Sequence, residues 1–175
     1  MRSRTAWTIL VLVVILIVIA LMRFNLTALQ EPGRLETLVG NRATHFLIRR
    51  ASREGIPPPP LDTKASIASG GIRYESDCGT CHGRDGHAQT VVGRWIYPRA
   101  ADLTSEQVQG YSDQELFWII RNGIRFTGMP AFGRVETADH IWDLANYVRT
   151  LPGALQNQSR LGSVRLEKQM PEEKE

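Results

Sequence analysis

Hydrophobic residues are distributed along this chain in a way that predicts helices throughout. Residues 6–22 are an uninterrupted run, nearly all apolar and without a charge, which is at the short end of the length that crosses a membrane. Three later stretches, residues 63–77, 112–123 and 137–151, are also predicted as helices, since each begins at polar residues suited to capping. No stretch has the pattern of a strand, so the sequence predicts an all-α fold.

Polar residues mark the beginnings of the predicted helices. Asp62 or Thr63 is placed to cap the first of them and Thr137 the last. Ser112 with Glu115 has the spacing of a capping box, and Thr104 is placed to open a further short helix in the same way. The last helix presents one apolar stripe, which consists of Ile141, Leu144, Ala145, Val148 and Leu151.

Composition divides the chain into four predicted parts. Residues 1–23 form an N-terminal membrane anchor, and residues 24–61 form a basic connecting segment that ends in four prolines, which favour a stiff extended spacer. Residues 62–152 form the folded domain, and residues 153–175 a charged tail that is expected to be disordered. The stretch 34–53 is predicted as a basic helix that lies on a membrane surface, packs against the folded domain or stays solvated, and the sequence leaves these three open.

The apolar run has a competing interpretation as a cleaved signal peptide. Such a peptide ends in a small-x-small cleavage site, whereas this run ends in Ile-Ala-Leu-Met-Arg at residues 19–23. We therefore expect it to remain as a single transmembrane helix. Arg2 and Arg4 precede it, and basic residues favour the cytoplasmic side. The folded domain is then expected on the periplasmic, extracytoplasmic side of the inner membrane.

The net charge of +3 is unevenly distributed. Residues 1–61 hold eight arginines against three glutamates, whereas residues 62–152 hold nine basic and eleven acidic side chains. The folded domain therefore has no basic stripe of the kind that binds nucleic acid. Only two cysteines are present, and both lie in one motif, which leaves no residues for a further disulfide.

The motif Cys78-Gly79-Thr80-Cys81-His82 has the C-x-x-C-H spacing of covalent haem attachment. Two thiols one helical turn apart can each add to a porphyrin vinyl group, and the next residue then brings an imidazole under the iron. We expect Cys78 and Cys81 to hold one haem c as thioethers, with His82 as an axial iron ligand. The alternatives are a thioredoxin-like redox pair, a zinc site that includes His87, and a structural disulfide. The first lacks the preceding strand, and the second lacks another C-x-x-C.

Met129 is expected to supply the second axial ligand. It lies in the loop Gly128-Met129-Pro130, where proline restricts the preceding residue to extended backbone. His87 is too close to His82 along the chain to reach the opposite face, and His140 lies off the apolar stripe. A thioether opposite an imidazole raises the reduction potential and leaves no iron position open. This arrangement is typical of an electron carrier rather than a catalyst.

Residues 62–152 resemble the class I monohaem cytochromes c, and with its anchor the whole chain resembles a membrane-anchored bacterial member of that family. The resemblance implies three to five helices around one haem, preceded here by the transmembrane helix. It also implies that the first and last helices of the domain cross near Gly70. The matching positions are the haem motif Cys78, Cys81 and His82, the ligand Met129, Gly70 and Tyr74 on the first helix, and Leu144 and Tyr147 on the last.

The same resemblance suggests residues around the haem. In this family a proline carbonyl often accepts a hydrogen bond from the proximal histidine, and Pro98 is our candidate for it. Trp118, Arg121 and Arg125 are either neighbours of the haem propionates or ordinary helix and surface residues.

The expected function is one-electron transfer, not enzymatic catalysis, within a respiratory or dehydrogenase chain. The expected partners are the membrane and redox proteins such as a respiratory complex, a dehydrogenase or a terminal oxidase, with no small-molecule substrate. Two alternatives remain. The chain could be a fixed cytochrome c subunit of a larger membrane oxidoreductase complex, or a haem enzyme or gas sensor with a labile distal ligand.

Overall fold

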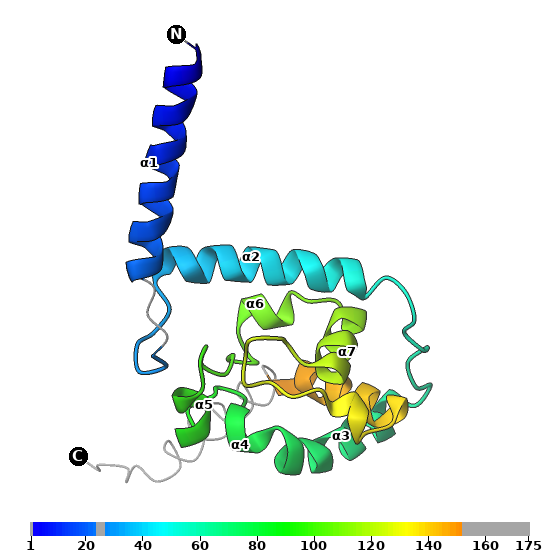
Figure 1. The fold of residues 1–175 in the computed structure, drawn as a ribbon. Helices are drawn as coiled ribbons and strands as arrows, with labels where there is room; N and C mark the ends of the chain where they lie inside the picture. The colour runs from blue at the N-terminus through cyan, green and yellow to red at the C-terminus, as the bar shows by residue number, and fades with distance from the viewer. Residues whose placement is uncertain (1, 24–26, 152–175) are drawn as a thin grey trace, which may run out of the picture. The chain divides into compact units, whose positions relative to one another are not determined.

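The computed structural model describes residues 2–23 and 27–151 (Figure 1). The chain divides into two compact units, with the boundary between Gln30 and Glu31. The predicted tail of residues 153–175 lies outside the described residues.

The first unit contains one long helix, α1 (Arg2–Arg23). Across the ranges that the structure describes, no helix is both long and apolar enough to cross a membrane. The predicted transmembrane helix is therefore wrong. The predicted single-pass location in the inner membrane, with the domain on the periplasmic side, depended on that helix and therefore has no support.

The second unit is built from helices, and no strand occurs among its described residues, as the sequence predicted. The element before the haem motif is a single helix that ends at the motif itself (Figure 1). A final helix covers residues 138–151. The others are α2 (Arg34–Ala51), α3 (Thr63–Asp77), α4 (Gly79–His82), α5 (Val91–Trp95), α6 (Glu106–Gln109), α7 (Asp113–Asn122) and the 3-10 helix η1 (Phe132–Arg134).

Side chains from α3, α7 and the final helix form the core of this unit. The predicted apolar stripe of the final helix is buried along its whole length. Against it lie Tyr74 of α3 and Phe117 of α7, and the Phe117 ring contacts that of Trp142 at a centroid distance of 4.7 Å. These helices are amphipathic, and burial of their apolar faces is the main favourable contribution to the fold.

The first and last helices of the domain approach each other at Gly70, where a close contact leaves no room for a side chain. A Cβ atom at Gly70 would overlap the carbonyl oxygen of Asp143 and lie 2.9 Å from the Cβ of Tyr147. Nearby, Ser66 donates a 2.6 Å hydrogen bond to the Asp143 carboxylate, and the rings of Tyr74 and Tyr147 meet at 5.0 Å. The crossing near Gly70 that the resemblance implied is therefore confirmed.

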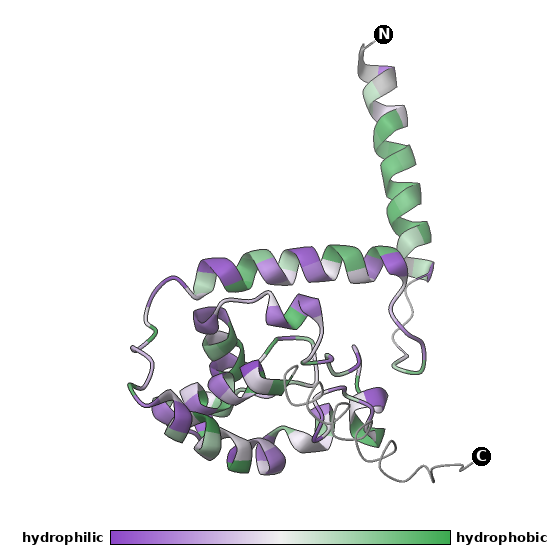
Figure 2. Ribbon diagram, turned by 180° about the vertical axis from the view of Figure 1, so that it is seen from behind, coloured by the Kyte–Doolittle hydropathy of each residue, from purple (hydrophilic) through white to green (hydrophobic). Residues whose placement is uncertain are grey.

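Helix α2 packs against α7 and belongs to the second unit. Ile48 is 2 % exposed and belongs to the core cluster. The ring of His45 stacks on the ring of Tyr111 at a centroid distance of 4.8 Å. Arg49 forms an ion pair with Glu115 at 3.6 Å. Of the three placements that the sequence left open for this helix, packing against the domain is the observed one. Polar and apolar residues alternate along its length (Figure 2), and its exposed apolar side chains are Leu35, Leu38, Val39, Phe46 and Leu47.

Most of the predicted caps are present. The Asp62 side chain accepts a 3.0 Å hydrogen bond from the backbone N–H of Ala65, and Ser112 and Glu115 form the expected capping box. The short helix α6 differs, because its cap is Ser105 and not Thr104. The Thr104 hydroxyl instead donates a hydrogen bond to the carboxylate of Asp102.

We expect Gly70→Ala to lower the free energy of unfolding of the haem-loaded protein by about 1–3 kcal/mol, because the added methyl group must push the two helices apart. The measurement is denaturant unfolding followed by far-ultraviolet circular dichroism. Gly40→Ala in α2 is the matched control, since nothing lies within 4 Å of a Cβ there. That variant should gain roughly 0.5–1 kcal/mol from helix propensity. Equal stability of the two variants would contradict the tight crossing.

Candidate functional site

The haem motif forms one helical turn directly after α3. Cys78 ends α3 and begins α4, so both thiols and the imidazole stand on a single short helix. The Tyr74 hydroxyl donates a 2.7 Å hydrogen bond to the carbonyl of Gly83 and ties the turn back to α3. Gly83 leaves the turn at a φ of 76°, which favours glycine.

Both cysteines are free thiols and half-buried. Burial, with smaller contributions from Asp77 and Cys81, raises the pKa of the Cys78 thiol to about 12. Neither thiol is committed to a disulfide, so both are free for attachment.

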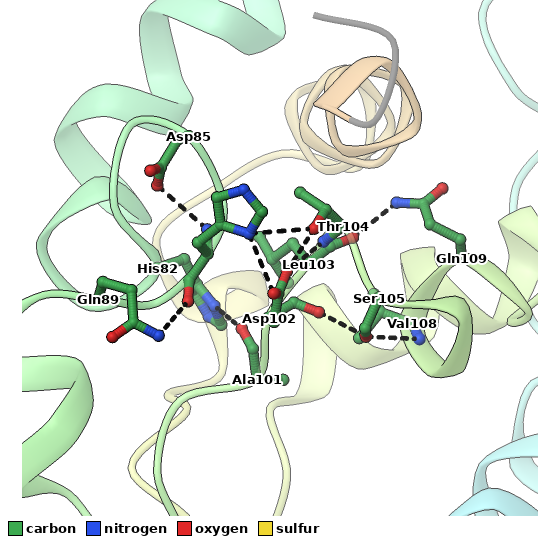
Figure 3. A network of polar contacts seen from close by, with 11 residues as sticks. His82, Asp85, Gln89, Ala101, Asp102, Leu103, Thr104, Ser105, Val108 and Gln109 are labelled. Carbon is green, nitrogen blue, oxygen red and sulfur yellow. Dashed lines mark hydrogen bonds and ion pairs between the residues drawn. The ribbon is translucent and has the colours of Figure 1, made fainter. Parts of the chain in front are cut away.

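One hydrogen bond, made by Nδ1, orients the His82 imidazole. Its Nδ1 lies 2.8 Å from the carbonyl oxygen of Ala101 (Figure 3). A carbonyl can only accept, so Nδ1 carries the proton and Nε2 keeps its lone pair for a metal. Burial lowers the pKa of His82, and the hydrogen bond to Ala101 opposes that shift only in part. The residue is therefore a neutral imidazole with a defined free nitrogen.

This carbonyl is not the one we expected. The resemblance pointed to Pro98, whereas the structure places the carbonyl of Ala101 on His82. Pro98 is half-buried in the segment that leads to Ala101, and its place near the haem stays a prediction.

Helix α5 packs beside the motif and is not among the helices that the sequence predicted. The Thr90 hydroxyl caps α5 and also donates a 3.0 Å hydrogen bond to the carbonyl of Cys81. A Cβ atom at Gly93 would overlap that same carbonyl oxygen. The backbone of the motif thus packs directly on a glycine of α5.

Met129 lies in the loop between α7 and η1, which is internally hydrogen-bonded. Its N–H donates to the Thr127 hydroxyl at 3.1 Å, and the Thr127 hydroxyl donates to the carbonyl of Ile124 at 2.7 Å. Gly128 lies against Ile96, just after α5, since a Cβ there would be 2.8 Å from its Cδ1 atom. The loop therefore meets the segment that continues from α5, which itself packs on the motif.

Cys78 and Met129 each pack against the core cluster while remaining partly exposed. A flat apolar ring with one exposed edge fits such surroundings. The donors also fit haem: two free thiols, a neutral imidazole and a thioether. Within the described ranges, no three His, Cys, Asp or Glu side chains come together as a metal-ion cluster, which argues against the zinc alternative. Other partly buried apolar side chains packed against this cluster include Leu103, Trp118, Ile124 and Phe132.

The suggested propionate neighbours differ in their surroundings. Trp118 is half-buried against the core. Arg121 is exposed, and one of its guanidinium nitrogens lies 3.5 Å from the carbonyl of Gly55. Arg125 is exposed. The roles of these three residues stay predictions.

Sequence reasoning missed a polar network beside His82. Asp102 accepts hydrogen bonds from Thr104 (Figure 3). One of its carboxylate oxygens also lies 3.0 Å from the Nδ1 of His87. The pattern Asp-x-Thr could have suggested a local turn, in which an aspartate accepts from the residue two positions later. Nothing in the sequence alone placed His87 beside it.

Known proteins resemble part of this chain in sequence and in fold. Residues 65–148, just under half of the chain, match the family described as cytochrome c oxidase, cbb3-type, subunit III. No curated protein matches. Among solved structures, a chain of the reducing HAO-like protein complex of Kuenenia stuttgartiensis is similar with a TM-score of 0.52 at 24 % identity. The alignment covers 56 % of this chain and 49 % of that one, so it spans about half of each.

We expect Gly93→Ala to lower the free energy of unfolding of the haem-loaded protein by about 1–3 kcal/mol, because the methyl group must displace the backbone of the haem motif. Gly79→Ala is the control inside the motif, since its Cβ would lie 3.6 Å from the nearest atom, the carbonyl oxygen of Tyr74. Both variants are measured by denaturant unfolding followed through haem absorbance. A Gly93 variant as stable as the Gly79 variant would show that α5 does not support the motif.

Proposed function

We propose that the c-type cytochrome domain at residues 65–148, with its covalently bound haem, works as a one-electron carrier and not as an enzyme. Cys78 and Cys81 hold the porphyrin as thioethers, and His82 and Met129 are the axial ligands of its iron. The observation that carries this proposal is the hydrogen bond from Nδ1 of His82 to the carbonyl of Ala101, because it leaves Nε2 as a neutral, oriented donor.

The motif has the geometry that attachment needs. One helical turn separates the two thiols, and the turn is secured at both ends by Tyr74 and Thr90. When bound, the haem supplies the ferric/ferrous couple. The chain would contribute the orientation of the imidazole and the exclusion of water by partly buried apolar side chains such as Leu103, Ile124 and Phe132.

Met129 supports the assignment as a carrier. The internal hydrogen bonds of its loop hold the backbone before ligation, so little conformational entropy is lost when the thioether binds. With a sulfur opposite an imidazole, no iron position stays open for oxygen or peroxide. Trp118, Arg121, Arg125 and Pro98 complete the proposed haem surroundings.

Redox proteins are the proposed partners, with no nucleic acid and no small-molecule substrate. The matched family is named for an oxidase subunit, and the similar solved chain belongs to a protein complex. Both names favour a second candidate function, a fixed electron-transfer subunit of a larger oxidoreductase. Purification under mild conditions separates the two, since stoichiometric redox partners favour the subunit and isolation of the chain alone favours a mobile carrier.

We expect Cys78→Ala to reduce the accumulation of haem-loaded protein by at least about tenfold, because one thioether and the packing around it are lost. Haem content per polypeptide is measured with the pyridine haemochrome assay. Thr80→Ala is the control, since Thr80 is an exposed residue between the cysteines. A normal haem content in the Cys78 variant would exclude this attachment site.

We expect Met129→Ala to keep the haem but to lower its potential by on the order of 100 mV, a fraction of the roughly 0.8 V that axial ligands control. The variant should also bind carbon monoxide at neutral pH, which the wild type should not. Met22→Ala is the control, because Met22 is 83 % exposed on α1. Potentials come from equilibrium redox titration. An unchanged potential, or carbon monoxide binding by the wild type, would favour the enzyme or sensor alternative.

A further inference from the structure

Three side chains form a hydrogen-bonded cluster behind the proximal histidine, which we call the proximal clamp: His87, Asp102 and Thr104. One oxygen of Asp102 accepts from the backbone N–H of Thr104 at 2.8 Å and from its hydroxyl at 2.6 Å. The other oxygen lies 3.0 Å from Nδ1 of His87, and the Thr104 hydroxyl lies 3.2 Å from the same nitrogen. The Asp102 carboxylate is thus bound on both sides.

The clamp is attached directly to the peptide unit that orients His82. The carbonyl of Ala101 and the N–H of Asp102 belong to one planar peptide unit. Fixing the Asp102 side chain therefore restricts the direction of the Ala101 carbonyl, which lies 2.8 Å from Nδ1 of His82 (Figure 3).

The other end of the clamp is attached to the chain that leaves the haem motif. The N–H of His87 donates to the Asp85 carboxylate at 3.1 Å, and the next residue, Ala88, donates to the carbonyl of His82 at 2.8 Å. Leu103 also donates to the carbonyl of Gly86 at 2.7 Å. These hydrogen bonds therefore hold the chain that follows His82 against the chain around Asp102.

We propose that His87, Asp102 and Thr104 are positioning residues that hold the Ala101 carbonyl on His82 and thereby set the donor strength of the proximal imidazole. This inference rests on the proposed role of His82 as an iron ligand. A strong hydrogen bond from Nδ1 makes the imidazole a better donor and favours ferric iron. If the Ala101 carbonyl is held less firmly, its hydrogen bond with His82 weakens and ferric iron is favoured less. The one-electron reduction of ferric to ferrous iron then occurs at a higher potential.

The charges of the clamp give this role a pH signature. The groups that act on His87 are its partner Asp102 and the nearby Asp85, and the hydrogen bond to Asp102 raises the pKa of His87 above its ordinary value of 6.5. Partial burial opposes the ionisation of Asp102, but hydrogen bonds from Thr104 and His87 outweigh it and lower the pKa of that carboxyl.

The sign of the pH effect follows from these charges. Protonated His87 compensates the negative charge of Asp102. As the pH rises through the raised pKa of His87, this compensation is lost and the carboxylate acts alone on the neighbouring peptide and the iron. A negative charge favours the ferric state, so the potential should fall in a step above pH 6.5.

The test is an equilibrium redox titration of the haem-loaded protein between pH 5 and 9. Asp102→Asn should raise the potential and move the midpoint of the pH step downward, and His87→Gln should abolish the step. Thr104→Val should raise the potential, whereas Thr104→Ser, which keeps the hydroxyl, should restore the wild-type value. Asp113→Asn is the charge-matched control, because Asp113 pairs with Arg149 at the start of α7.

A second measurement is the pH titration of the His87 ring by nuclear magnetic resonance in the diamagnetic ferrous protein. The midpoint should be lower in the Asp102→Asn variant than in the wild type. The inference is overturned if Asp102→Asn and Thr104→Val change the potential no more than Asp113→Asn does while only stability falls. Failure of the proposed function is distinguishable, since a wild type without the visible spectrum of histidine–methionine ligation would refute the ligand assignment itself.

Discussion

The close contact between α3 and the final helix at Gly70 is the constraint on which the site depends. The backbone of Asp143 lies where a side chain at Gly70 would be. Packing at this point and the hydrogen bond from Ser66 to Asp143 hold the two helices at a fixed separation. Because α3 ends at Cys78, its position determines where the haem motif begins. The core thus serves as the support from which one short turn carries two thiols and an imidazole.

The motif is then held by elements that are distant from it in sequence. Thr90 secures the carbonyl of Cys81, and Ala101 accepts from the ring of His82. Both contacts act on the backbone or on the second ring nitrogen, so they leave the reactive atoms free. Outer contacts of this kind are the general way in which a metal ligand is tuned without being replaced.

Local signals in the sequence predicted much of this structure. The Asp62 cap, the Ser112–Glu115 capping box and the stripe on the final helix depend on residues within one or two turns of each other. Errors arose where another interaction competed. Thr104 had the spacing of a cap, but its hydroxyl binds Asp102 and Ser105 caps α6 instead. The apolar run in α1 was predicted to cross a membrane, and no described helix has the length and apolarity to do so.

By itself the sequence determined the all-α class, the chemistry of the C-x-x-C-H motif and the helix that leads to it, because spacing along one chain is enough for all three. The tertiary structure alone decided that Ala101, and not Pro98, faces His82, and that α2 packs on α7 through Ile48. These contacts join residues far apart in the chain. They are selected by the shape and burial of the whole domain, which no local pattern encodes.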